Sequence, residues 1–315
     1  MMRILDRHKR DRFADFLFKG VSSFFALLII VLMLFLFVVL AIESAPAIKA
    51  FGFKFIYSTD WNPVRASFGA LPAIYGTIVL SAIAIVIAVP VSIGIAVFLT
   101  EMAPKKIRGP VGAAIELLAS IPSIIYGMWG LFVFAPFLSA YVEPFLIENF
   151  GFLPLFRGTP LGIGMLPAGF ILAIMIIPFI SSVIRDVFLM VPPMLKESGY
   201  GMGATKFEVI WNIVIPFARS GIMGAVILGL GRALGETMAV TFMIGNSHDL
   251  SISLLDPATS ISATLANEFT EAVDDIYLSG LVELGLILFA ITFVVLALSK
   301  LMTMRFAPQK GRGKA

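Results

Sequence analysis

Arg232 and Glu236 are two opposite charges inside an apolar run, residues 217–245. If this run is a membrane-spanning helix that enters the hydrocarbon near Ser220, Arg232 lies about 18 Å inside a core of ~30 Å. An arginine at that depth costs at least about 2.5–3.5 kcal/mol, so it should face protein or water and serve a function. A spacing of four residues places Glu236 on the same helical face. The pair therefore predicts either a functional position that faces protein or water or a buried ion pair that only locks helices together.

A second group of residues with informative spacing lies in the loop 190–216. Glu197 is followed six residues later by Gly203, then by Ile213 and Pro216. The Pro-Pro pair at the start of the loop can begin a short helix, and the glycine allows a sharp turn. A second, amphipathic helix is expected to end before Pro216. Such an elbow could transmit force to a partner subunit, or it could pack on its own bundle.

Catalysis by this chain alone is not expected. The two histidines, His8 and His248, fall on opposite sides of the predicted membrane, and cysteine is absent. These residues cannot form a His-assisted nucleophile or a His-metal cluster. The segment closest to a phosphate-binding loop, Gly313-Lys314-Ala315, lacks the hydroxyl residue and the following helix. If ATP drives this protein, another subunit must bind it.

The elements that must position these residues are membrane helices. Of the 315 residues, 59% are hydrophobic and 14% are charged, against roughly 45–50% and about 25% in soluble domains. The apolar runs predict an all-α bundle with six spans at 21–42, 73–99, 113–139, 161–184, 217–245 and 277–299. The first run is longer than the apolar region of a signal peptide, so we expect it to remain as an anchor.

The positions of lysine and arginine predict the orientation of the bundle. They gather in the N-terminal segment, in the loops after the second and fourth spans, and in the C-terminal tail. The last loop of the opposite side, about 246–276, contains acids but no lysine or arginine. Because basic residues near short loops stay in the cytoplasm, both termini are expected there.

The remaining polar residues and the prolines suggest how the bundle is built. Arg185-Asp186, Glu116 and Glu283 lie near the ends of spans, where structural ion pairing or capping is expected. Prolines flank or interrupt several spans, which predicts bent helices around a pathway: Pro72, Pro90, Pro122, Pro136 and Pro178.

The 190–216 loop resembles the EAA loop of ABC importer permeases. Glu197, Gly203, Ile213 and Pro216 stand at the family positions, with every spacing matched. Small or apolar residues replace the family's two alanines and its leucine: Ser198, Gly199 and Ile215. The resemblance implies a coupling helix that docks in a groove of an ATPase subunit.

Longer stretches, 74–77, 116–127, 229–240 and 263–269, are similar to the PstC family of permease subunits in phosphate-specific ABC importers. This resemblance implies a type I importer permease in the bacterial inner membrane, with Arg232 and Glu236 acting in phosphate translocation. The implied partners are a PstA-type permease, two PstB-type ATPases and a PstS-type phosphate-binding protein. No cofactor is implied for this chain, because the partner ATPase would bind ATP and magnesium.

Other functions stay open at this point. A single arginine cannot separate phosphate from sulfate or molybdate. A membrane sensory or structural component of phosphate signalling would be favoured by an extramembrane signalling module, and none is visible. An autonomous proton-coupled carrier would need more intramembrane acids, and many such carriers have two related halves.

The expected organisation along the chain follows from these observations. It comprises a cytoplasmic arm (1–20), the first span (21–42), an outer loop (43–70), a permease core (71–304) that includes the coupling loop, and a cytoplasmic tail (305–315).

Overall fold

The computed structural model describes residues 2–306, and the side chains of residues 15–301. The predicted tail (305–315) therefore lies almost entirely outside the described residues, as do most side chains of the predicted arm (1–20). Regular secondary structure in the described part is helical. The α-helices are α1 (Met2–Glu43), α2 (Ala45–Phe51), α3 (Lys54–Tyr57), α4 (Leu71–Val97), α5 (Lys105–Ala119), α6 (Ser123–Trp129), α7 (Ala135–Phe137), α8 (Glu143–Phe150), α9 (Met165–Leu189), α10 (Pro193–Gly201), α11 (Lys206–Val209), α12 (Ile215–Leu234), α13 (Met238–Met243), α14 (Ile261–Glu268) and α15 (Asp275–Phe306).

Six helical segments of the described chain are long and apolar enough to cross a membrane, as predicted. Some combine α-helices with short π-helical turns. The segments are Asp15–Glu43, Leu71–Met102, Ser123–Phe150, Met165–Leu189, Lys206–Leu234 and Asp275–Leu301. The chain is therefore a multi-pass, all-α membrane protein.

The third span differs from the predicted 113–139, which straddles a break in the helix. α5 ends at Ala119, and α6 begins at Ser123 directly after Pro122. Proline lacks a backbone N–H and disfavours helical geometry in the residue before it, so the helix stops here. The apolar membrane segment is instead Ser123–Phe150, and α5 is a separate helix.

The fifth span also differs from the predicted 217–245. α12 ends at Leu234, and a second short helix, α13, follows after a break. At the other end, the helix of the coupling loop does not stop before Pro216. It continues through a π-helical turn, Ile210–Val214, into α12. A wider turn ahead of Pro216 relieves the clash that a proline ring makes with the preceding helical turn.

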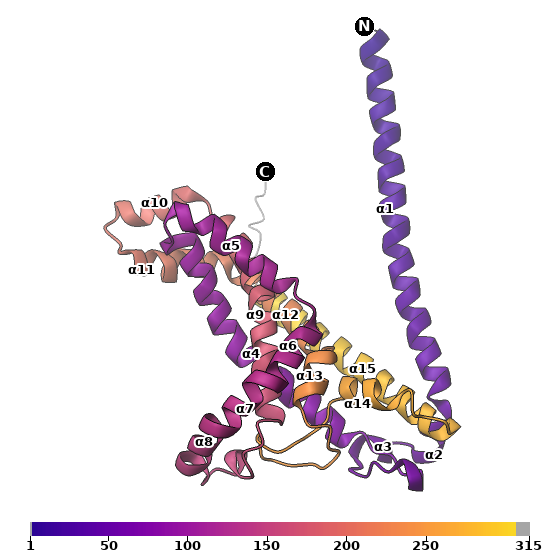
Figure 1. Ribbon diagram of the computed structural model, residues 1–315. Coiled ribbons are helices and arrows are strands. Elements are labelled where there is room, and N and C mark those ends of the chain that lie inside the picture. Colours follow the sequence, from indigo (N-terminus) through magenta and orange to yellow (C-terminus); the bar gives the residue numbers. More distant parts are fainter. Residues whose placement is uncertain (1, 307–315) are drawn as a thin grey trace.

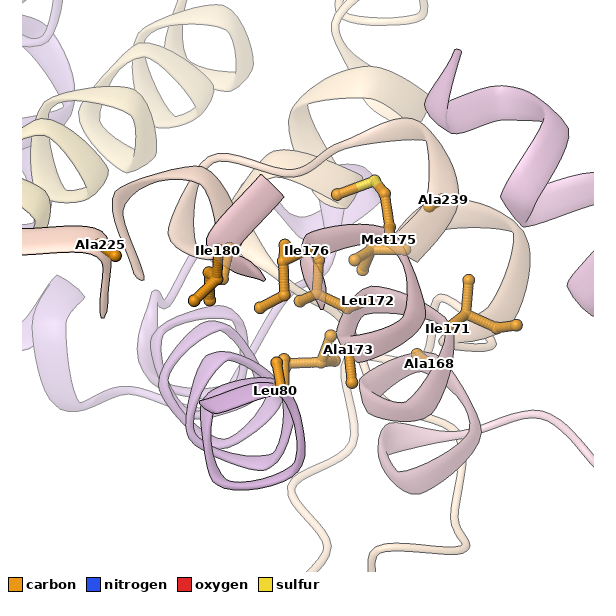
Figure 2. Packing of buried hydrophobic residues seen from close by; sticks show 14 of the residues in the cluster. Leu80, Ala168, Ile171, Leu172, Ala173, Met175, Ile176, Ile180, Ala225 and Ala239 are labelled. Carbon is orange, nitrogen blue, oxygen red and sulfur yellow. The ribbon is translucent and has the colours of Figure 1, made fainter. Parts of the chain in front are cut away.

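Helix α9 forms the centre of the core. Figure 2 shows Ile176 and Ile180 of α9 among Leu80 of α4, Ala225 of α12 and Ala239 of α13. All five side chains are almost completely buried. The alanines allow close approach of the helix backbones, which is how membrane helices gain packing energy.

The two ends of the molecule carry different elements. Figure 1 shows the start of α1 and the α10–α11 elbow toward one end, and α3 and α8 toward the other. The N-terminal part of α1 stands apart from the bundle, whereas its C-terminal part contacts α15, where the ring centroids of Phe37 and Phe289 lie 5.8 Å apart. The apolar side chains of α1 from Phe16 to Val39 are exposed. A helix that is apolar all round needs lipid or another chain around it.

Candidate functional site

The predicted charge pair lies at the break in the fifth span. Arg232 is in the last turn of α12, which ends at Leu234, and Glu236 lies in the non-helical link before α13. The prediction that the two side chains share one helical face is therefore wrong, because the helix does not continue between them. Gly235 is the capping residue at this end, and glycine is favoured where a helix stops.

The carboxylate of Glu236 binds backbone rather than the guanidinium. Its Oε1 accepts a hydrogen bond from the backbone N–H of Ala239 at 3.3 Å. Thr237 donates from its hydroxyl to the carbonyl of Gly235 at 3.3 Å. Helix starts leave backbone N–H groups without intrahelical partners, and an acidic side chain there is stabilising. Glu236 is thus a cap for α13 in this conformation.

Arg232 is held by an aromatic ring. Its Cζ lies 5.7 Å from the ring centroid of Phe179, a residue of α9. The side chain is half-buried, and no ion pair within the described part of the chain involves it. A guanidinium stacked on a ring keeps its N–H donors in one plane, where they suit the oxygens of an oxyanion. Within the described part of the chain, the guanidinium of Arg232 is therefore not engaged in an ion pair.

A second helix break meets the first. α6 begins after the break at Pro122, and a Cβ on its Gly127 would lie 3.0 Å from Cα of Ala239 in α13. On the same helix, Tyr126 donates its hydroxyl to the carbonyl of Leu118 at 2.8 Å. Non-helical backbone at membrane depth is tolerated only where it is buried in protein or lines a water-filled cavity.

Two of these residues were not predicted from the sequence. Tyr126 lies on α6, whose next residue, Gly127, approaches Ala239 of α13, and Phe179 forms the stacking surface for Arg232. The break at Pro122 was a usable signal for Tyr126. Nothing in the sequence separates Phe179 from the other aromatic residues of apolar runs.

The coupling loop has the predicted elbow shape. α10 is followed by a turn in which Gly203 has a φ of +86°, a conformation that favours glycine. Glu197 and Gly203 are exposed. Thr205 and Glu208 then form a capping box that starts α11.

The remaining motif residues hold the elbow together. A Cβ on Gly199 would lie 2.7 Å from Cδ1 of Ile213, so α10 packs directly on the second arm of the elbow. Pro216 lies in the first turn of α12. The second arm is therefore continuous with α12, which carries Arg232 in its last turn.

An ion pair fastens the elbow to the bundle. Nζ of Lys196 in α10 lies 2.5 Å from Oε1 of Glu101, at the end of the second span. The side chain of Glu101 is only 8% exposed. In the sequence, Lys196 served only as one of the basic residues that predict the membrane orientation. Its pairing with Glu101 could not be predicted, because no spacing rule connects two residues so far apart in the chain.

The other polar residues of the spans divide into two cases. Arg185 pairs with Glu116 at 2.7 Å and with Asp186 at 3.1 Å, as expected for structural ion pairs. Glu283 is 6% exposed, and its Oε2 has no hydrogen-bond partner among the residues that the structure describes. The expectation of a structural ion pair or cap is wrong for Glu283.

The sequence of the chain is similar to a family of transport proteins. The family described as binding-protein-dependent transport system inner membrane component matches residues 88–307. A phosphate transport system permease protein PstC from Mesorhizobium japonicum is 56% identical over 307 residues, 96% of this chain and 94% of that protein. The PstC protein of Pasteurella multocida is 53% identical over 95% of this chain and 94% of its own length.

Solved structures show the same fold at much lower sequence identity. A chain of a bacterial alginate ABC transporter, solved with its alginate-bound periplasmic protein, has a TM-score of 0.59 at 20% identity. The match covers 85% of this chain and 88% of that one. A chain of the MetNI methionine ABC transporter in an inward-facing conformation has a TM-score of 0.53 at 16% identity, over 74% and 94% of the two chains. The bundle thus has the fold of type I ABC importer permeases.

Proposed function

Since the chain belongs to the family of binding-protein-dependent transport system inner membrane components, we propose that it is the permease subunit of an ATP-driven importer of inorganic phosphate. One observation carries the substrate assignment. Relatives named as phosphate transport permeases are 53–56% identical to this chain over nearly its whole length. Identity at this level over nearly the whole chain supports the same role in the same kind of complex.

Arg232 is the proposed anion-contacting residue of this subunit. Its guanidinium stacks on Phe179 and has no ion-pair partner in the described chain, so the planar donors are available to phosphate oxygens. Glu236 lies at the adjoining break, with its carboxylate half-buried. We propose that this negative charge keeps the anion from being held too tightly. Binding and release of phosphate need no covalent chemistry.

The elbow at 190–216 is the proposed contact with a PstB-type ATPase. It presents exposed apolar side chains, including Met202, Phe207 and Trp211, and an exposed apolar patch of this kind suits a protein interface. Because α11 continues into α12, ATP-driven movement of the elbow would shift Arg232. The Lys196–Glu101 ion pair would carry the same movement into the second span.

The complete complex would contain a PstA-type permease, two PstB-type ATPases that bind ATP and magnesium, and a PstS-type phosphate-binding protein. The elbow and both termini would face the cytoplasm of a bacterium, with the chain in the inner membrane. The start of α1 and the elbow point toward the same end of the molecule in Figure 1, which supports this orientation. The distribution of basic residues favours the same side.

Reconstitution tests this function. The chain, co-expressed with its neighbouring subunits and purified with them, is placed in liposomes, and uptake of radioactive phosphate is measured with and without ATP. We expect ATP-dependent uptake that excess unlabelled phosphate suppresses and that sulfate or molybdate leaves unchanged. Equal competition by sulfate or molybdate would contradict the substrate assignment, and uptake without ATP would contradict the importer class.

A further inference from the structure

Glu283 is a buried carboxylic acid that the proposed transport mechanism does not use. It lies in α15, inside the segment that is apolar enough to cross a membrane. The residue is 6% exposed, and within the described part of the chain its Oε2 has no hydrogen-bond partner. Burying such a group without a partner costs free energy, so a partner from outside the chain would be stabilising.

The carboxyl group lines an apolar groove of about 300 Å³. One wall comes from α15 and the other from α2, α3 and the glycine between them. The lining residues are Ile48, Gly52, Phe53, Ile56, Glu283, Leu286, Ile287 and Ala290. A groove of this size and composition accepts part of an acyl chain.

The outer wall of the groove has the composition of a segment that lies at a membrane surface. Phe53 is 86% exposed, and Ile48 and Ile56 are exposed beside it. Lys49 and Lys54 are the sequence neighbours of lining residues and are themselves exposed. Apolar side chains interleaved with lysine are typical of helices that rest in the headgroup region. The groove therefore opens toward lipid.

We propose that this groove binds a phospholipid with a primary ammonium headgroup, such as phosphatidylethanolamine. The ammonium donates to the carboxylate of Glu283, and the lysines beside the rim attract the phosphodiester. An acyl chain lies along the apolar wall of α15. The carboxyl group, the apolar wall and the neighbouring lysines match the three chemical parts of this lipid class. The site is separate from the anion position at Arg232.

The depth of Glu283 is within reach of a headgroup. The residue lies eight positions after the start of α15 at Asp275, about 12 Å along the helix axis. The polar headgroup region occupies roughly 5–7 Å of that on one side of a bilayer. An ammonium group therefore has to reach about 5–7 Å below the headgroup region, which is comparable to the snorkelling of long charged side chains.

The test measures lipid binding to the intact importer complex by native mass spectrometry. The complex is first stripped of lipid and then titrated with phosphatidylethanolamine or phosphatidylcholine of identical acyl chains. The quaternary ammonium of phosphatidylcholine has no N–H donor. We expect phosphatidylethanolamine to bind about tenfold more tightly, as one charge-assisted hydrogen bond would give.

Three variants separate the parts of the proposal. Glu283→Gln should abolish the preference for phosphatidylethanolamine, whereas Glu271→Gln, which removes an exposed carboxylate outside the groove, should keep it. Ala290→Phe fills the groove and retains the carboxyl group, so it should weaken binding of both lipids. A preference that survives Glu283→Gln would overturn the proposal. The proposal is also overturned if the wild-type complex binds the two lipids equally. Equal binding is the result expected if the carboxyl group of Glu283 is protonated or if another subunit covers the groove.

Discussion

Gly76 in α4 lies directly against the backbone of Thr259, since a Cβ on this glycine would lie 1.8 Å from the threonine's carbonyl oxygen. The next residue of the helix, Thr77, accepts a hydrogen bond at its Oγ1 from the backbone N–H of Ile261 at 3.0 Å. The loop that precedes α14 is thus docked on the start of the second span. This loop connects α13 to α14, and α13 begins directly after the break at Glu236. The contact with α4 therefore also holds the chain that follows the break.

Gly76→Ala is expected to destabilise the protein by about 1–3 kcal/mol, the usual range for forcing an extra carbon into a packed site. Gly94→Ala is the matched control, because it lies in the same helix with no heavy atom within 4 Å of an added Cβ. That change should be neutral or stabilising by up to ~1 kcal/mol, as alanine favours helices over glycine. Thermal unfolding of the purified complex measures both. Equal melting temperatures for the two variants would show that the loop is not docked as described.

Gly203→Val is expected to uncouple ATP hydrolysis from phosphate uptake. The glycine has a φ of +86°, and an added Cβ would meet no atom within 4 Å. The cost therefore comes from the backbone, because a β-branched residue strongly disfavours positive φ. Uptake in proteoliposomes should fall while ATP hydrolysis persists.

Gly201→Val is the control for the coupling loop. This glycine also has open space around a Cβ but lies in the last turn of α10 without positive φ. Its uptake should stay near the wild-type level. If both variants transport normally, the shape of the turn is not needed for coupling.

The sequence was sufficient to predict the six apolar segments but not to predict where their helices break. Pro90 and Pro178 lie inside continuous helices, whereas Pro122 ends one. The local cost of a proline is similar in each case, and the outcome depends on whether neighbouring segments can satisfy the freed backbone groups. That information is present only in the packed bundle.

The contacts of the charged residues were likewise not predictable where they depend on the packed bundle. The i, i+4 rule for Arg232 and Glu236 assumes an unbroken helix, and the glycine between them was the signal against it. Gly203, in contrast, was correctly placed in a sharp turn because its role is local. The ring of Phe179 under Arg232 and the missing partner of Glu283 depend on contacts between distant segments, which no periodicity encodes.

Glu268 is expected to make the stability of the end of the bundle that carries α14 depend on pH. Its carboxylate accepts hydrogen bonds from Trp61 at 2.7 Å and Tyr277 at 2.7 Å, and lies 2.8 Å from Nε2 of His248. Burial raises the pKa of Glu268, but the hydrogen bonds from these three residues outweigh burial and leave the pKa below its ordinary value of 4.5. Stabilisation from a carboxylate with a lowered pKa is present above the ordinary value and is lost as the pH falls through the folded-state pKa.

Melting temperatures of wild type and Glu268→Gln between pH 3 and 7 measure this effect. The wild type should be more stable near neutral pH, and the difference should shrink as the pH falls below about 4.5. Glu148→Gln, which changes an exposed carboxylate, should show little difference across the range. A difference for Glu268→Gln that does not change with pH would mean that the charge of the carboxylate is unimportant.

Arg232→Gln is expected to leave the complex assembled and to reduce phosphate uptake strongly. The guanidinium makes no ion pair in the described chain, so its loss leaves no buried charge unpaired. Glutamine can still pack on Phe179 but offers a phosphate no positive charge. Removal of one charge-assisted contact of about 1.5–3 kcal/mol lowers transport by roughly ten- to a hundredfold. Arg232→Lys should retain part of the activity, because it keeps the charge but not the planar donors.

Glu236→Gln separates the two roles of the neighbouring carboxylate. The amide oxygen of glutamine can still accept the hydrogen bond from the backbone N–H of Ala239, which caps α13, while the negative charge is removed. If the charge helps to release the anion, uptake should fall although the melting temperature is unchanged. Uptake by proteoliposomes, measured alongside recovery of all subunits, decides between the alternatives.

The same two measurements decide the role of Arg232. Normal transport by an assembled Arg232→Gln complex would exclude a role of Arg232 in translocation. Failure of that variant to assemble would favour helix packing as the role of Arg232.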